Sequence, residues 1–322
     1  MMRVGIIATG RIAGIAADTI SKMEGAECIA VASRTMEKAA LFAREHGIPR
    51  AYGSYASLLD DADIDLVYVA TPHSHHYDVT MEAISKGKPC LVEKAFMANY
   101  RQSREVLDLA RQQRVFVAEA MWTRYQPAVG IIRDMTRRIG TLRLMTANIG
   151  YNMAWRKPRL LRPELCGGAL LDVGVYGLNF VRMFCDAQVQ QIGGQCIQAD
   201  TGMDISEVIT MSLDGGVLAT IQASASATCS NRGVITGTEG FVVVDNINNP
   251  QLISLYAPDR TLVEERQVPP QITGYEYEFL ACQEALEAGL TESPQMPHSE
   301  TLTIMQMMDR LRHQWGVAYP MD

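Results

Sequence analysis

Three side chains of this sequence could together oxidise an alcohol or reduce a carbonyl: Lys94, Tyr176 and Asp172. Removing a hydride from a carbinol carbon requires the hydroxyl proton to leave at the same time. A tyrosine with its ordinary pKa of about 10 is a poor base at neutral pH, and a nearby lysine ammonium would lower that pKa by favouring the phenolate. Asp172 precedes Tyr176 by four residues, so the two share a helix face, where the carboxylate could hold the lysine charged or orient substrate hydroxyls. Spacing alone does not connect Lys94 with this helix.

A second chemical signal lies at the start of the chain, where residues 4–13 read Val-Gly-Ile-Ile-Ala-Thr-Gly-Arg-Ile-Ala. A short apolar run passes through small residues into a helical pattern, which is the context of a dinucleotide-binding turn. Small residues let the backbone approach a pyrophosphate, and the N–H groups of the helix start bind it. Alanines stand at two positions where glycine is usual. We predict cofactor contacts from Ala8, Thr9, Gly10, Arg11 and Ile12.

The end of the next apolar run bears on the choice of cofactor. NAD-binding folds place an acidic residue there to accept a hydrogen bond from the ribose 2′-hydroxyl. This chain has Ser33 and Arg34 instead, and an arginine can donate a forked pair of hydrogen bonds to a 2′-phosphate. We therefore predict NADP as the preferred cofactor, with NAD possible because a solvated arginine tolerates it.

Two further strand ends supply candidate residues. Thr71, Pro72, His73 and His76 follow one strand, and Glu93 and Lys94 close another. Three histidines within four residues suggest a metal, but no cysteine or carboxylate set accompanies them. Ligands of open parallel sheets bind at the carboxyl ends of the strands, so we predict a loop lining the cofactor site and no metal.

The elements that must position these residues form a repeating pattern over residues 1–120. Strand-like and helical stretches alternate, which predicts right-handed crossovers and a doubly wound parallel sheet. The strands are continuous apolar runs, as burial on both faces requires. The expected strands are 4–8, 27–33, 65–70, 89–92 and 115–118, and the expected helices are 11–23, 36–46, 54–60, 75–86 and 100–113.

The pattern changes after residue 120. Helix is expected over 127–138, 169–184, 275–288 and 299–316, and strand over 141–151, 204–213, 217–226, 233–237 and 241–245. The turn Asp214-Gly215-Gly216 is a hairpin signal. We predict two domains, a dinucleotide-binding Rossmann domain over 1–120 and a substrate-binding α/β domain over 121–322 built on an antiparallel or mixed sheet.

Composition excludes several other classes of protein. The chain has 322 residues, a net charge of −7 and an apolar share of 48%, which argues against nucleic-acid or anionic-membrane partners because these select basic surfaces. No apolar run reaches the roughly 18 residues of a membrane span. The seven cysteines have neither metal-site nor disulfide-framework spacing, which favours a reducing compartment such as the cytoplasm.

These stretches together resemble the Gfo/Idh/MocA oxidoreductase family, and within it the dihydrodiol and D-xylose dehydrogenase group. The resemblance extends over nearly the whole chain. It is carried by residues 7–13, by Glu93-Lys94, by 119–124 (Glu-Ala-Met-Trp-Thr-Arg), by 167–176 (Gly-Gly-Ala-Leu-Leu-Asp-Val-Gly-Val-Tyr) and by the ending 316–320.

The resemblance implies an N-terminal Rossmann domain and a C-terminal domain whose open, mostly antiparallel sheet forms a homodimer or a dimer of dimers. It implies Lys94 as the active-site lysine, Tyr176 as the proton-transferring residue, and cleft positions for His76, Trp122 and Arg124. Tyrosine at position 176 points to aldoses or trans-dihydrodiols rather than inositols. Two departures concern the site: Ala95 replaces the family proline after Lys94, which disfavours a cis bond there, and His73 replaces a frequent asparagine.

Three functions are consistent with these residues. The leading hypothesis is an NAD(P)-dependent dehydrogenase that moves a hydride between the cofactor and a sugar-like alcohol or trans-dihydrodiol. The alternatives are an oxidoreductase that retains its cofactor and shuttles hydride between two sugars, and a catalytically silent dinucleotide-binding sensor. A sensor has no reason to keep a proton-transfer pair, so Lys94 and Tyr176 favour an enzyme.

Overall fold

The computed structural model describes residues 1–322 and divides into two compact units. The first comprises residues 1–125 and 271–305, and the second comprises 126–270 and 306–322. One contains a six-stranded parallel sheet and the other an eight-stranded, mostly antiparallel sheet. The predicted fold class is thereby confirmed.

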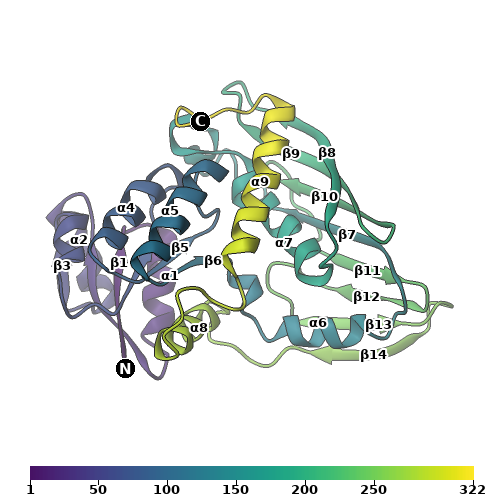
Figure 1. The fold of residues 1–322 in the computed structure, drawn as a ribbon, viewed down its shortest axis with the longest axis horizontal. Coiled ribbons are helices and arrows are strands. Elements are labelled where there is room, and N and C mark those ends of the chain that lie inside the picture. The colour runs from purple at the N-terminus through teal and green to yellow at the C-terminus, as the bar shows by residue number, and fades with distance from the viewer. The chain divides into compact units, whose positions relative to one another are not determined.

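The first sheet has the strand order β3-β2-β1-β4-β5-β6, with every neighbour pair parallel (Figure 1). This is the order of a Rossmann dinucleotide-binding sheet. Its strands are β1 (Met2–Ile7), β2 (Ala26–Ala32), β3 (Arg50–Tyr52), β4 (Leu66–Val69), β5 (Cys90–Glu93) and β6 (Val117–Ala120). The helices between them are α1 (Arg11–Ile20), α2 (Met36–His46), α3 (Tyr55–Leu59), α4 (His73–Ser85) and α5 (Tyr100–Gln113). Only β3 was not expected.

Both faces of this sheet are covered, as the continuous apolar strands require. One face packs against α1, α2 and α8 (Glu276–Glu287), and its core includes Ile6, Tyr68 and Phe279. The other face packs against α3, α4 and α5. The partition therefore differs from the predicted boundary at residue 120. Residues 271–305 join the first unit because the apolar side of α8 completes the core on that face.

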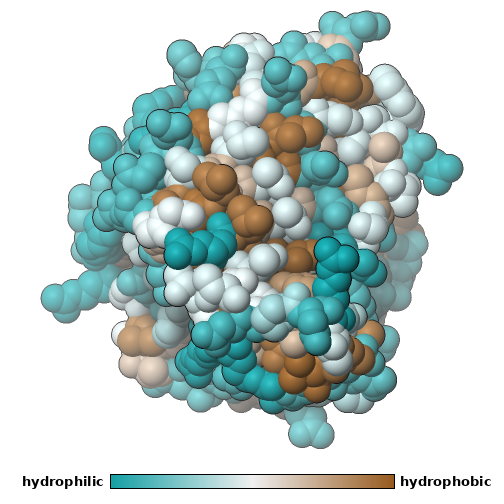
Figure 2. Space-filling view, turned by 90° about the vertical axis from the view of Figure 1, so that its right-hand side faces the viewer, coloured by the Kyte–Doolittle hydropathy of each residue, from teal (hydrophilic) through white to brown (hydrophobic).

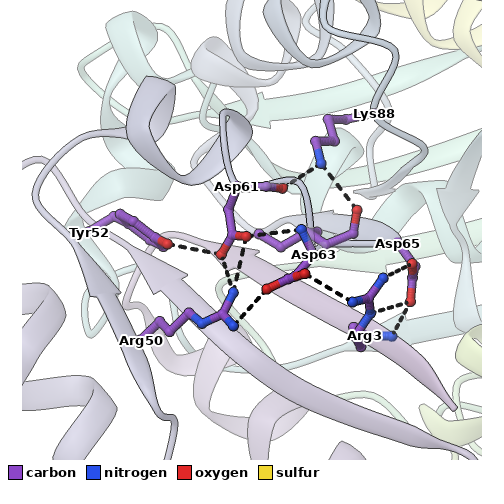
Figure 3. Close-up of polar contacts among 8 residues, drawn as sticks. Arg3, Arg50, Tyr52, Asp61, Asp63, Asp65 and Lys88 are labelled. Atoms are coloured by element: carbon purple, nitrogen blue, oxygen red, sulfur yellow. Dashed lines mark hydrogen bonds and ion pairs between the residues drawn. The ribbon is translucent and has the colours of Figure 1, made fainter.

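The amino-terminal edge of the same sheet is closed by ion pairs (Figure 3). Arg3 at the start of β1 binds Asp63 and Asp65, and Arg50 at the start of β3 binds Asp61 and Asp63. Lys88 donates to the carbonyl of Asp61. These contacts fasten the loop before β4 to the starts of β1 and β3 and to the turn before β5, at the edge opposite to the one where ligands bind.

The second sheet has the order β14-β13-β12-β11-β7-β10-β9-β8, in which only the β7–β10 pair is parallel. Its strands are β7 (Leu142–Gly150), β8 (Val189–Gln198), β9 (Asp204–Leu213), β10 (Val217–Ser224), β11 (Gly233–Gly237), β12 (Gly240–Val244), β13 (Leu252–Tyr256) and β14 (Leu262–Gln267). Gly215 and Gly216 both have positive φ. This confirms the expected hairpin between β9 and β10.

Two helices, α6 (Ala128–Thr136) and α7 (Val175–Phe184), pack on one face of the second sheet. The strands alternate accordingly: Met145, Ile209 and Ile221 are buried, whereas Leu144, Val208 and Leu218 are about half exposed. Short 3-10 turns at η1 (Trp122–Arg124), η2 (Pro158–Leu161) and η3 (Pro163–Leu165) and a π-helix, η4 (Leu170–Gly174), complete the structure. The last helix, α9 (His298–Trp315), contributes to both units.

Candidate active site

The predicted cofactor residues of the first unit all follow strands at the carboxyl edge of the parallel sheet. The chain leaves β1 in one direction and β4 in the other, so the order of strands reverses between these two neighbours. Such a switch point opens a crevice above the strand ends, where open α/β sheets bind ligands. The turns after β1 and β4 border it.

The β1–α1 turn has the features that a pyrophosphate needs. Gly10 is the N-cap of α1, but no side chain caps this helix and no acidic residue stands in its first turn. A Cβ added to Gly10 would meet no atom within 4 Å. Helix N–H groups are thus left without a side-chain acceptor beside open space, and the positive end of the helix dipole favours an anion there. The residues present fit a dinucleotide.

Ala8 has φ of 99°, a backbone conformation usually adopted by glycine. Its N–H donates to the carbonyl of Ala32 at 2.9 Å, which ties the turn to the end of β2. The β1–α1 turn therefore follows the backbone path of a glycine turn, although alanine occupies position 8.

The end of β2 places Ser33 and Arg34 next to this turn. The hydroxyls of Ser33 and Thr9 lie 3.4 Å apart. Arg34 is exposed. Burial raises the pKa of Tyr55, and the positive charge of Arg34 opposes that shift, so the guanidinium lies near this ring. A phosphate at this strand end would meet an exposed cation and a pair of hydroxyl groups.

The ring nitrogens of His73 and His76, which follow β4, lie next to backbone carbonyl oxygens. The Nε2 atom of His73 lies 3.2 Å from the Lys94 carbonyl oxygen. His76 is fully buried, with Nε2 at 2.8 Å from the carbonyl of Thr71 and Nδ1 at 3.0 Å from that of Phe96. Burial lowers the pKa of His76, although these acceptors oppose the shift. The His76 side chain thereby supports the segment that carries Lys94.

That segment contains a cis peptide bond between Lys94 and Ala95. The absence of proline had favoured a trans bond here, so this expectation was wrong. The carbonyl groups of Lys94 and Ala95 both lie next to histidine nitrogens, His73 and His76 respectively. The Lys94 side chain itself is partly exposed.

Glu93 differs from its predicted environment. Its carboxylate accepts a hydrogen bond from Tyr68, and it lies close enough to the fully buried Glu278 to raise the pKa of that residue, next to the larger effect of burial. Glu119 on β6 is equally enclosed, and burial raises its pKa to about 7. The carboxylate of Glu93 therefore belongs to a cluster of buried carboxyls that includes Glu119 and Glu278.

Trp122 and Arg124 occupy the turn after β6, and both are nearly buried. The Trp122 ring stacks on Tyr275 with centroids 4.2 Å apart and planes inclined by 5°. Arg124 forms an ion pair of 3.1 Å with Glu300. These partners come from residues 271–305, which explains why this stretch is an integral part of the first unit.

In the second unit, Asp172 and Tyr176 lie on one continuous helical segment, η4 followed by α7. The expected helix is present, but its first turn is a π-helix, a rare form that recurs at functional sites. Both side chains are almost buried, with 5% and 6% exposed. Asp172 accepts from Arg159 at 2.6 Å. The carboxylate predicted to serve a lysine or a substrate hydroxyl therefore has a guanidinium partner from the 3-10 turn η2.

Comparison with known proteins decides the family. Residues 2–121 match the oxidoreductase family with an NAD-binding Rossmann fold, and residues 132–243 match the GFO/IDH/MocA C-terminal domain. The chain belongs to the Gfo/Idh/MocA oxidoreductase family. It is an NAD(P)-binding oxidoreductase.

Relatives cover the whole length of this Gfo/Idh/MocA protein. It is 35% identical to the trans-1,2-dihydrobenzene-1,2-diol dehydrogenase of Danio rerio and 32% identical to that of Mus musculus, in each case over 100% of this chain and 99% of the relative. Among solved structures, an aldose-aldose oxidoreductase from Caulobacter crescentus complexed with glycerol has a TM-score of 0.87 at 20% identity, covering 98% of this chain and 97% of that one. A 3-ketoreductase from Actinomadura kijaniata in complex with NADP and TDP-benzene has a TM-score of 0.86 at 22% identity, covering 97% of each chain.

Several partners of the predicted site residues were not expected from the sequence. Arg159, Tyr275 and Glu300 act through partners that are 13 to 176 residues away in the chain. No local pattern announces such pairings. Glu119 stood within a stretch used for the family resemblance, yet only its enclosure reveals an unusual carboxyl.

Proposed function

We propose that this protein is an NADP-preferring dehydrogenase that acts on a sugar-like alcohol or a trans-dihydrodiol. The single observation that carries the proposal is the presence of both halves of the chemistry in one chain. An uncapped helix start faces open space, the turn before it contacts Ser33, and a nearly buried tyrosine and aspartate share the segment 172–176. The full-length relatives named as dihydrodiol dehydrogenases support this substrate class.

In this mechanism Tyr176 exchanges the hydroxyl proton with the substrate oxygen, and Lys94 keeps the phenol acidic enough to do so. An ammonium beside the phenol would favour the phenolate electrostatically and so make the tyrosine a better base at neutral pH. A bound nicotinamide dinucleotide supplies or accepts the hydride. Asp172, held by Arg159, orients the substrate hydroxyls or the lysine. The meeting of Lys94 with Tyr176 is part of the proposal.

The first unit would hold the cofactor through the carboxyl edge of its sheet. The turn Ala8–Ile12 binds the pyrophosphate through backbone N–H groups, and Ser33 and Arg34 bind the 2′-phosphate. Thr71, Pro72 and His73 border the same edge, and Trp122 with Arg124 lies after β6. His76 and Glu93 support these residues from within, as their buried contacts suggest.

We also propose a homodimer through the open face of the second sheet, in a reducing compartment such as the cytoplasm. Leu144, Val208 and Leu218 expose apolar area on that face. Figure 2 views the molecule from the right-hand side of Figure 1, where hydrophobic patches alternate with neutral and hydrophilic ones.

All seven cysteines are free thiols, which supports the reducing compartment. No helix combines the length and apolar character that crossing a membrane requires.

Replacement of Tyr176 by phenylalanine tests the proposed function. Loss of the proton-transferring hydroxyl should lower kcat/KM by about 100-fold or more, while the dissociation constant for NADPH stays within about twofold because the cofactor residues are intact. Substrates are a panel of aldoses, inositols and trans-dihydrodiols with each cofactor. Tight NADPH binding by the unmodified protein without turnover of any member would contradict the proposal.

A further inference from the structure

Two acidic side chains on β9, Asp204 and Glu207, are enclosed beneath the segment that carries Asp172 and Tyr176. Their residues are 0% and 3% exposed. Residues three apart on a regular strand would face opposite sides. Here the register between β8 and β9 shifts beside Ile205, as in a β-bulge, and such an inserted residue turns both carboxyls to one face.

Asp204 caps the π-helix from a distant strand. Its Oδ2 accepts the N–H of Leu170, the first residue of η4, at 2.6 Å, and the N–H of Ala169 is a further donor. The helix has no cap from its own residues. A Cβ added to Gly168 would lie 2.3 Å from Asp204 Oδ1. The missing side chain of Gly168 therefore makes room for the carboxylate of Asp204.

Glu207 lies against the other end of the same π-helix. A Cβ added to Gly174 would lie 2.3 Å from Glu207 Oε1. No N–H or O–H group donates to either oxygen of Glu207, nor to Oδ1 of Asp204. The two carboxyls are within hydrogen-bonding reach of each other, a contact that requires a proton on one of them.

The surroundings decide which carboxyl holds the proton. Burial raises the pKa of Asp204, but the backbone N–H groups that it accepts and the nearby cation of Arg312 oppose that shift, whereas nothing opposes it at Glu207. Burial, together with the charge of Asp204, raises the pKa of Glu207 well above its ordinary range. The other titratable groups that face the pair are Cys196 on β8 and Tyr319 near the C-terminus, both with raised pKa values.

We propose that Asp204 and Glu207 share one proton and act as positioning residues that hold the segment 170–176, and with it Tyr176, in its reactive place. Each carboxyl contacts one end of η4, so the pair fixes both ends of the turn that precedes the tyrosine. Loss of the shared proton would place two adjacent negative charges in a buried site. The inference rests on the proposed function, since it assigns Tyr176 the proton transfer.

The experiment compares Glu207→Gln with the unmodified protein. Glutamine has nearly the same shape and can donate to Asp204 at every pH, so it imitates the protonated state permanently. We expect kcat to fall at alkaline pH in the unmodified protein and this fall to move to higher pH or disappear in Glu207→Gln, with the NADPH dissociation constant unchanged. Glu284→Gln, which removes an exposed negative charge, should retain the original pH profile. An identical alkaline fall in Glu207→Gln and the unmodified protein would overturn the proposal.

Two further measurements separate this proposal from the proposed function. Infrared difference spectra should contain the carbonyl band of a protonated buried carboxyl that Glu207→Gln removes, whether or not the protein turns over any substrate. Absence of that band would overturn the shared proton even in an active enzyme, whereas its presence in an inactive protein would contradict only the proposed function.

Asp204→Asn should lower kcat about 10- to 100-fold, as misplacement of a reacting group does, with NADPH affinity within about twofold. If kcat in Asp204→Asn stays unchanged, Asp204 is not a positioning residue.

Discussion

We predict that Arg34 makes the protein bind NADP more tightly than NAD. Hydrogen bonds to a charged group contribute about 1.5–3 kcal/mol, so Arg34→Ala should weaken NADPH binding by about 10- to 100-fold. NADH lacks the 2′-phosphate, and its affinity should change little. Fluorescence titration of both cofactors measures the two constants. Arg44→Ala, an exposed arginine near the far end of α2, is the matched control, and equal losses for the two cofactors would refute the assignment.

Glu119 makes stability depend on pH. Burial raises the pKa of this carboxyl from 4.5 to about 7, so between these values the folded protein binds a proton that the unfolded chain has released. Stability therefore falls as the pH rises through this window. Glu119→Gln should remove most of that fall, which amounts to about 3 kcal/mol between about pH 5 and about pH 8.

Chemical unfolding at these two pH values tests the prediction, with tryptophan fluorescence as the probe. Glu284→Gln replaces an exposed glutamate of the same unit and should leave the pH dependence unchanged. A decline in Glu119→Gln that matches the unmodified protein would show that this carboxyl does not retain its proton.

Among the secondary-structure elements, the β1–α1 turn keeps a glycine-like path with alanine. A side chain at φ of 99° costs about 1–3 kcal/mol, of which the greater flexibility of glycine in the unfolded chain offsets about 0.5–1 kcal/mol. Ala8→Gly should therefore raise the unfolding free energy by about 1 kcal/mol while NADPH still binds. Denaturant melts would measure the change. Destabilisation in this variant would mean that the methyl group has favourable contacts that outweigh the strain.

The segment η4–α7 shows a different dependence of an element on its surroundings. Leu170–Gly174 has no side-chain cap from its own residues and is wound as a π-helix. Its geometry is set by Asp204 and Glu207 from β9. Helix propensity predicts that a helix forms here, but the register of its first turn follows from the carboxyls beneath it.

For the whole molecule, the open face of the second sheet is the predicted dimer contact. Leu218 and Leu144 are paired neighbours on β10 and β7 and are about half exposed. Leu218→Asp should place a charge in the contact and convert the dimer to a monomer, because burying an unpaired carboxylate is unfavourable. Light scattering gives the mass. Leu41→Asp, an equally exposed leucine on α2, should leave the dimer intact. A monomeric unmodified protein would refute the prediction.

Much of this structure was predictable from the chain alone, because the signals are local. Alternating apolar runs and amphipathic stretches determine the parallel sheet, and α2 and α5 begin and end at the predicted residues. Polar alternation on the long strands indicates a sheet with one covered face. The β9–β10 hairpin at Gly215 and Gly216 and the β1–α1 turn were predictable for the same reason, because each depends on residues adjacent in sequence.

Other features were decided only by tertiary structure. The strand β3 has three residues, too few for a periodic pattern, and forms by pairing with β2. The assignment of residues 271–305, the cis bond after Lys94 and the partners of Asp172 and Trp122 all depend on groups distant along the chain. The same is true of the carboxyls of Glu119, Asp204 and Glu207. A sequence specifies their identity as acids, but the loss of water around them, and hence their protonation, exists only once the chain has folded.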